Sequence, residues 1–346
     1  MRSKSAGGWG IGLITFGVLS LLAAAILTWV VVPNQKQLPA DTDTTRRLTG
    51  TGKLVLDPQA IASGNLAAAL RVNVPVAADR TVKVLATDGD KAQVSDARSL
   101  STASGQPLGR TSAVYAVDRT SLQPAADPPA SWQVVPAEGL TVSWPIGAEQ
   151  TNYTGWVAET QTTTPLTYVR EESKGGVNTY VYQAEISAAP IKDEQVLAAL
   201  PSSLPAGTLA ALAAALPIPD DVRAQLTQAL PQLGDPVSLS YTYEATVTYW
   251  VEPTTGIVVD TTREEVRRVG LAGPGGRVLP VAPIFDVATQ FTGESVTDAA
   301  NDAKDAQSQI DLYGQTLPLI LLVVGVLAVL GGVLVLVRGR RSAPAG

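Results

Sequence analysis

The sequence lacks cysteine and histidine altogether, and aromatic residues make up only 5% of it. Without cysteine and histidine the chain can form neither a disulfide nor a zinc site built from these residues. The Ser-His-Asp and Cys-His catalytic arrangements are excluded for the same reason. Its 346 residues are 45% hydrophobic, which is too apolar for a disordered chain. We therefore expect a folded protein that is not an enzyme and that has neither a metal nor a cofactor.

Carboxylates are the remaining acid and base groups for catalysis near neutral pH. Two adjacent pairs, Glu171-Glu172 and Glu264-Glu265, occur in strand-like segments. Neighbouring residues of a strand point to opposite faces, so neither pair can serve one site. We expect both pairs to lie at solvated strand edges, and we predict no catalytic residue.

Two long stretches without charge, residues 9–32 and 317–337, predict membrane helices. At 1.5 Å per residue such helices span about 31–36 Å, enough for a bilayer core of about 30 Å. A cleavable signal peptide is the alternative for the first stretch, but its apolar run continues past Ala25, which favours an uncleaved anchor. Glycines in both stretches permit the two helices to pack together, a contact that the sequence leaves open.

Basic residues flank both stretches on their outer sides: Arg2, Lys4, Arg338, Arg340 and Arg341. By the positive-inside rule the tails 1–8 and 338–346 are cytoplasmic, and residues 33–316 form the extracytoplasmic domain of a two-pass inner-membrane protein. All 31 acidic residues of the chain fall in that domain. Such a negative surface argues against nucleic acid as a partner.

The domain between the two stretches has the pattern of antiparallel β structure. The clearest hairpin runs from Ser238 to Val259 and turns at residues 253–256. One face of its first strand carries the apolar and aromatic residues Tyr241, Tyr243, Val247, Tyr249 and Val251. Further hairpins are predicted where Gly175-Gly176 and Asp88-Gly89-Asp90 separate strand-like segments.

Residues 193–231 depart from this pattern, because alanine and leucine recur there at helical spacing between five prolines. Each proline ends or begins a helix, which gives short helices at about 193–200, 206–216 and 220–230. A stalk helix is expected at 296–316, directly before the second membrane stretch. The predicted fold class is therefore α+β: a mainly antiparallel β ectodomain with a small inserted helical cluster, flanked by two transmembrane helices.

Four motifs carry a resemblance to a known family: WPIG at 144–147, YTGW at 153–156, GGVNTYVY at 175–182 and WVEPTTG at 250–256. Through them the chain resembles the PorA family of actinobacterial membrane proteins, over nearly its whole length. The architecture is also similar to that of periplasmic lipoprotein carriers and of scavenger-receptor class B proteins. These two likenesses imply the handling of lipid, but they supply no functional residue.

The functional hypothesis from the sequence is that the domain binds or passes an apolar envelope component such as lipid. Its basis is the apolar strand face beside helices with surplus leucine. The candidate lipid-facing or lid residues are Tyr241, Tyr243, Val247, Tyr249, Val251, Leu209, Leu212 and Leu216. Three alternatives stay open: the face is ordinary core, the helices form a fixed cap, or the chain is a scaffold or sensor for a partner envelope protein complex. The expected partners are membrane lipid and an envelope protein.

Overall fold

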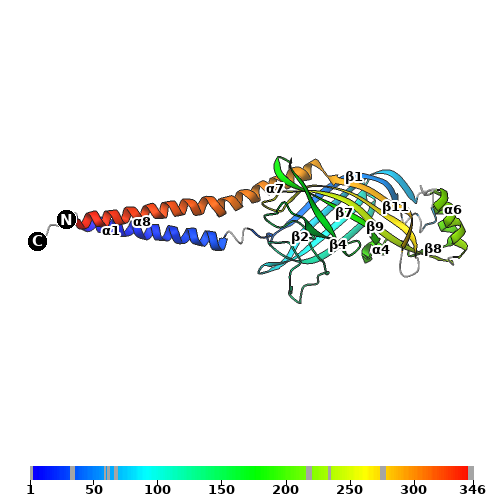
Figure 1. Cartoon of the computed structure of the whole chain (residues 1–346), viewed down its shortest axis with the longest axis horizontal. Coiled ribbons are helices and arrows are strands. Elements are labelled where there is room, and N and C mark those ends of the chain that lie inside the picture. Colours follow the sequence, from blue (N-terminus) through cyan, green and yellow to red (C-terminus); the bar gives the residue numbers. More distant parts are fainter. Residues whose placement is uncertain are drawn as a thin grey trace. The chain divides into compact units, whose positions relative to one another are not determined.

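The computed structural model of the chain separates into two compact units, residues 38–303 and the two terminal segments 1–37 and 304–346 (Figure 1). The structure describes residues 3–31, 36–57, 60, 63–65, 69–215, 220–232, 235–272 and 278–341.

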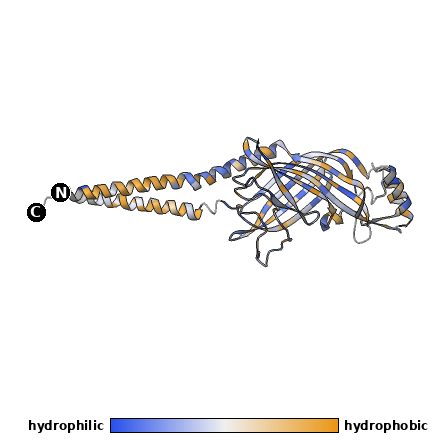
Figure 2. Cartoon of the chain, in the orientation of Figure 1, coloured by the Kyte–Doolittle hydropathy of each residue, from blue (hydrophilic) through white to orange (hydrophobic). Residues whose placement is uncertain are grey.

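The terminal unit contains helices α1 (Ser3–Ile26) and α8 (Leu317–Arg341), with the π-helical turns η1 (Leu27–Val31) and η5 (Leu312–Thr316). Two helical spans, Gly8–Val31 and Gly293–Arg338, are long and apolar enough to cross a membrane, by length and composition alone. Figure 2 shows α1 and α8 as almost continuously hydrophobic. Such all-round apolar character is typical of helices that are surrounded by lipid.

Helices α1 and α8 lie side by side, and glycines make the contact close. A Cβ atom added to Gly17 would lie 2.6 Å from the carbonyl oxygen of Gly325, and one added to Gly332 would lie 2.6 Å from that of Gly10. Any side chain at these positions would push the two backbones apart. The contact between the helices that the sequence left open is therefore confirmed, and small residues create it.

The larger unit is built on one antiparallel sheet in the form of a half-barrel. Its strands are β1 (Asp43–Leu56), β2 (Leu70–Asp88), β3 (Lys91–Thr102), β4 (Pro107–Asp118), β5 (Tyr153–Val157), β6 (Thr162–Lys174), β7 (Val177–Pro190), β8 (Ser203–Leu204), β9 (Val237–Val251), β10 (Val258–Ala272) and β11 (Val278–Phe291). Their order is β4-β3-β2-β1-β11-β10-β9-β7-β6-β5, with β8 paired to β9. The predicted mainly antiparallel β fold with several helices is confirmed.

The three predicted hairpins are present as β2–β3, β6–β7 and β9–β10. In the β9–β10 turn the buried carboxylate of Glu252 accepts hydrogen bonds from the backbone N–H groups of Thr254 and Thr255, at 3.1 and 2.9 Å. Gly256 has φ 72°, and a Cβ there would lie 2.4 Å from the carbonyl oxygen of Trp144. The WVEPTTG motif thus encodes a turn that only glycine can complete.

Helices α4 (Glu194–Ala198), α5 (Ala206–Ala215) and α6 (Asp220–Ala229) lie within the ranges expected from the proline pattern, and α7 (Gly293–Asp311) precedes η5. Asp193 caps α4 by accepting from the backbone N–H groups of Gln195 and Val196. The side chain of Gln195 bonds both backbone groups of Ser112 in β4, accepting from its N–H at 3.0 Å and donating to its C=O at 2.7 Å. These bonds fix α4 to the outermost strand of the sheet.

The main core lies against the face of β9 that carries Tyr243, Val247 and Val251, which is called the inner face below; all three side chains are fully buried. The segment between β4 and β5 supplies Trp144, whose ring lies 4.7 Å from that of Tyr249 and 5.3 Å from that of Tyr182, centroid to centroid. Figure 2 shows hydrophobic and hydrophilic residues alternating along the strands. Alternation of this kind places one face of a sheet on a core and the other in water.

Candidate functional site

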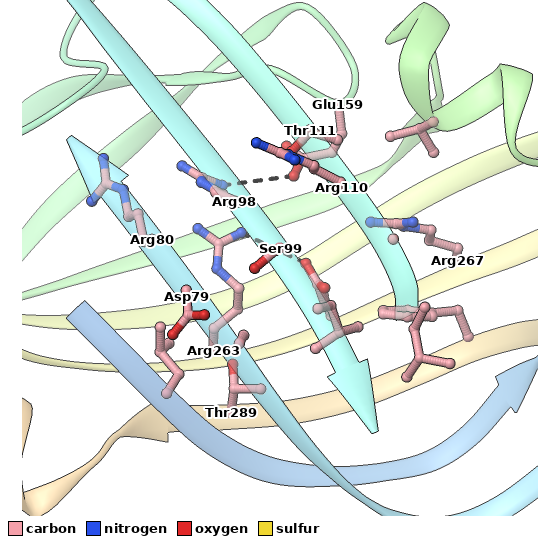
Figure 3. Close-up of a pocket in the computed structure, with 18 of the residues that line it drawn as sticks. Asp79, Arg80, Arg98, Ser99, Arg110, Thr111, Glu159, Arg263, Arg267 and Thr289 are labelled. Atoms are coloured by element: carbon pink, nitrogen blue, oxygen red, sulfur yellow. Dashed lines mark ion pairs between the residues drawn. The ribbon is translucent and has the colours of Figure 1, made fainter. Parts of the chain in front are cut away.

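A cavity of about 170 Å³ opens on the inner face of the half-barrel, and arginines dominate its polar lining (Figure 3). The charged residues that line it are Asp79, Arg80, Arg98, Arg110, Glu159, Arg263, Glu265 and Arg267. Strands β2, β3, β4 and β10 supply seven of these eight residues, and Glu159 follows β5. The cavity is therefore built by distant parts of the chain and depends on the order of the strands in the sheet.

Strand register explains why arginines face the core. Arg263 lies directly opposite Val247, and Arg267 lies directly opposite Tyr243, in the β9–β10 pairing. Opposite residues of an antiparallel pair point to the same face, so both arginines share the inner face with the main core. Arg80 and Arg98 form another directly opposite pair, in β2 and β3.

The carboxylate of Asp96 binds both Arg80 and Arg98 and fixes their positions. Arg80 donates two hydrogen bonds of 3.0 Å to the two oxygens of Asp96, and Arg98 donates one of 3.2 Å. Burial would raise the pKa of Asp96, but the two guanidinium groups outweigh it and lower the pKa to about 2. Arg80 also donates to the carbonyl oxygens of Thr141 and Val142, at 3.3 and 3.0 Å. Through these hydrogen bonds Arg80 links strand β2 to the segment between β4 and β5, which covers the inner face of the sheet.

A second network surrounds Arg263. Its Nη1 donates to the hydroxyl oxygen of Tyr243 at 3.0 Å, and that hydroxyl donates to Oε2 of Glu265 at 3.2 Å. Burial raises the pKa of Tyr243 well above its usual value, so the hydroxyl keeps its proton. Glu265 has a side chain only 14% exposed. The expectation of a solvated strand edge is therefore wrong for Glu265, because strand alternation places it on the inner face with Arg263.

Glu159 contributes a carboxylate 3.8 Å from Nη1 of Arg98. Burial would raise its pKa, but Arg98, Arg263 and further groups outweigh burial and lower it. Glu159 therefore stays ionised at neutral pH and is no candidate for a general acid. Among the described residues, no group of three or more acidic side chains is placed to hold a metal ion.

A smaller cavity of about 60 Å³ adjoins the first, and the two share one wall. Five residues line both cavities: Arg80, Arg98, Glu159, Tyr249 and Arg263. They are called the arginine wall below. Three buried side-chain polar atoms in the described part of the chain have no hydrogen-bond partner, and all three belong to residues that line these cavities: Arg267 Nε, Thr141 Oγ1 and Trp144 Nε1. Unpaired buried polar atoms are costly, so their concentration here makes this region the candidate functional site.

The residues predicted from the sequence fall mostly in the core. Tyr241, Tyr243, Val247 and Val251 are buried, as are Leu209 and Leu212. Tyr249 is the exception, because it is half-buried in the arginine wall. Leu209, Leu212 and Tyr241 line a separate apolar cavity of about 30 Å³. Leu216 lies outside the described residues, and a lid role for this region remains a prediction.

Sequence reasoning missed the arginines of the site. In the segment from Arg263 to Arg268 both alternating faces are charged, with Arg263, Glu265 and Arg267 on one and Glu264 and Arg268 on the other. Polarity therefore gives no means of telling the inner face from the outer one. The partner strand carries the signal that could have identified the inner face of β10. The residues of β9 that pair with Arg263 and Arg267 belong to its strongly apolar face.

The fold and the cavity together define a class of protein: an antiparallel half-barrel with an arginine-lined interior, in a chain with two candidate membrane helices. The family model described as Porin PorA matches residues 9–334, and the chain belongs to this family. A protein named Porin PorA from Corynebacterium resistens is 23% identical, and the match covers 95% of this chain and 96% of that one. The resemblance stated from the four sequence motifs is thus confirmed.

Two solved structures with weak likeness are both MaoC-type dehydratases. A putative MaoC domain protein dehydratase from Chloroflexus aurantiacus has 12% identity, 80% coverage of each chain and a TM-score of 0.14. A MaoC-like dehydratase has 12% identity, covers 74% of this chain and 76% of its own, and has a TM-score of 0.13. Scores this low carry no argument about fold or activity.

The family corrects two expectations from the sequence. Porins are channels of outer membranes, so membership contradicts a domain that binds or passes lipid and equally one that acts as a scaffold or sensor. It also contradicts the location as a two-pass inner-membrane protein with an extracytoplasmic domain. Both expectations came from treating the apolar face of β9 as an unfilled surface and from the charge of the tails. In the structure that face of β9 is buried in the main core.

Proposed function

We propose that this chain is a channel protein of the cell envelope whose half-barrel supplies the polar surface that small solutes contact, with a preference for anions. One observation carries the proposal: in a member of the Porin PorA family, two adjoining cavities meet at the arginine wall. The larger cavity is lined by five arginines and three carboxylates. Asp96, behind Arg80 and Arg98, adds a fourth carboxylate. The small positive excess favours anions.

Helices α1 and α8 have a different part in this proposal. No charged residue occurs from residue 9 to 32 or from 317 to 337, so the pair offers no polar lining for a solute. Large apolar side chains such as Trp9, Phe16, Leu327 and Leu334 are more than half exposed, which suits contact with lipid acyl chains. The helices therefore anchor the chain in the outer membrane of the envelope, and in this proposal the path through that membrane is formed where several copies of the chain assemble. The half-barrel, with α4, α5 and α6 as an inserted cluster, is the domain outside the bilayer.

The outer face of the half-barrel supports this division. On β9 that face carries Ser240, Thr242, Glu244, Thr246 and Thr248, whereas the lipid-facing side of a membrane-spanning strand is apolar. The half-barrel thus stands in water and presents its arginines to the solute. We expect no catalytic turnover, because the buried carboxylates are held ionised and neither histidine nor cysteine is present.

Conductance across a planar bilayer tests the function. The purified full chain should produce stepwise currents in potassium chloride, and in a salt gradient its reversal potential should lie toward that of chloride. Arg263→Gln should shift the reversal potential toward that of potassium. Arg268→Gln is the matched control, because Arg268 follows on the opposite face of β10 and pairs with Glu244.

Currents no different from those of a protein-free bilayer, at all protein amounts tested, would refute a channel. Currents that are unchanged by Arg263→Gln would show that the arginine wall does not contact the conducted ions. A shift of the same size with Arg268→Gln would overturn the assignment to the inner face.

A further inference from the structure

We propose that the larger cavity binds a small organic anion with one apolar flank, of the class of aromatic or short aliphatic carboxylates, and that Arg267 is its principal contact. The inference deepens the proposed function, on which it rests, by naming the chemical class of the solute. It starts from Arg267, whose Nε is buried without a hydrogen-bond partner in the described part of the chain.

The charge of Arg267 is available to a ligand. Arg80, Arg98 and Arg263 each have a carboxylate within 4 Å, namely Asp96, Glu159 or Glu265. No described carboxylate lies within ion-pair distance of Arg267. Its guanidinium instead lies 4.6 Å from the centre of the Phe285 ring, which holds it in position without neutralising it. A carboxylate that enters the cavity can supply the missing acceptor.

Carboxylates on the same lining oppose the binding of an anion. Glu159 and Glu265 line the same cavity and repel an entering anion. Each already has an arginine, at 3.8 Å for Glu159 with Arg98 and at 3.7 Å for Glu265 with Arg263. Asp79 also lines the cavity and offsets one of the two remaining charges, those of Arg267 and Arg110, so one positive charge remains in excess on this lining.

The remaining wall explains why the anion should carry an apolar flank. Residues of β3, β4 and β11 complete the lining with Leu100, Leu108, Ile284, Phe285 and Phe291. A cavity of about 170 Å³ exceeds the room that a carboxylate group alone fills. A bare inorganic anion would leave this apolar wall in contact with water, whereas an aromatic ring would cover it.

The test uses the purified full chain in detergent and three probes: benzoate, acetate and benzyl alcohol. Benzoate has both the charge and the ring, acetate has only the charge, and benzyl alcohol has only the ring. Calorimetry should show benzoate binding most tightly. Arg267→Gln should raise the Kd for benzoate about tenfold or more, as expected for the loss of a charge-assisted hydrogen bond. Arg268→Gln should leave the Kd unchanged.

A second variant covers the case in which Arg267→Gln fails to fold. Leu100→Trp fills the apolar part of the cavity without touching the ion pairs, and it should also abolish benzoate binding. Equal affinity for acetate and benzoate would overturn the apolar flank, and equal affinity for benzyl alcohol would overturn the anion site. No binding of benzoate to the wild-type chain would overturn the inference entirely.

The two proposals fail separately. Stepwise bilayer currents without benzoate binding would overturn the ligand class and leave the channel. Benzoate binding without currents would uphold the site and refute the channel.

Discussion

The helix pair and the half-barrel solve the problem of close packing in opposite ways. Helices α1 and α8 meet through Gly10, Gly17, Gly325 and Gly332, with no charged side chain between residues 9 and 32 or 317 and 337. The half-barrel places arginines beside its core and balances them with Asp96, Glu159 and Glu265. One region depends on the shape of its backbone, and the other on paired charge.

In the proposed arrangement, with the helix pair in lipid and the half-barrel in water, the difference follows from what surrounds each region. Lipid tails are as apolar as leucine, so apolar surface alone does not bring two membrane helices together, and close backbone contact has to do so. The half-barrel has a polar outer face, so burial of Tyr243, Val247 and Val251 drives its folding. The stability gained there can offset the cost of holding charge inside. A polar cavity is therefore possible in the half-barrel and not between the two helices.

Removing a paired charge should have the largest effect. Asp96→Ala leaves Arg80 and Arg98 partly buried without their shared carboxylate, and it should destabilise the full chain by about 3 kcal/mol. Thermal unfolding in detergent measures it. The control Asp43→Ala removes an ion pair to Lys83 in which both side chains are 52% exposed, and it should cost about 1 kcal/mol or less. Equal losses would show that buried charge is no special feature of the half-barrel.

Acid should reveal the same pair in the unaltered protein. The folded pKa of Asp96 is about 2, below its ordinary value of 3.8. A lowered folded pKa means that the stabilisation is complete above about pH 4 and is lost as the pH falls toward 2. The loss amounts to about 2 kcal/mol. Denaturant unfolding measures the free energy of unfolding at each pH between 5 and 2. This free energy should fall less steeply with falling pH for Asp96→Asn than for the wild type. Identical pH dependence in the two proteins would contradict the role of the ion pairs of Asp96.

A larger side chain placed in the contact between α1 and α8 should separate the two helices. Gly17→Ile brings a Cβ within 2.6 Å of the carbonyl oxygen of Gly325, and separating the helices should cost roughly 1–2 kcal/mol. Gly12→Ile, in the same helix, is the control because nothing lies within 4 Å of its Cβ position. Proteolysis of the helix segment in detergent should be faster for Gly17→Ile alone. Equal rates would show that the glycines do not hold the pair.

The smallest change is expected from a single hydroxyl. Tyr243→Phe removes the group between Arg263 and Glu265 but leaves these two charges 3.7 Å apart, so the loss should be about 1 kcal/mol. Thermal unfolding of this variant should show one cooperative transition slightly below that of the wild type. A loss as large as that of Asp96→Ala would mean that the hydroxyl, and not the ion pair, sustains this network.

The sequence predicted what local chemistry controls. Turn residues such as Gly89, Gly175 and Gly256 all have positive φ in the structure, and each marks a hairpin that was expected. Alternation along β9 assigned its inner face correctly. The arginine wall was not predicted, because it needs β2, β3 and β10 to belong to one sheet, in which β1 and β11 lie between β2 and β10. The pairing of β1 with β11 joins residues more than a hundred positions apart. Asp96 and Glu159 gave no local signal at all.

One polar contact affects whether these molecules associate with one another at high concentration. The amide of Gln195 has the same donor and acceptor as a peptide group, and it occupies both backbone groups of Ser112 on the outermost strand. A strand of a second molecule would need those two groups to extend the sheet across β4. Helix α4 thus helps to protect this edge against edge-to-edge aggregation, together with the N–H groups of Val135 and Ala125, which donate to the carbonyl oxygens of Val114 and Ala116 in the same strand.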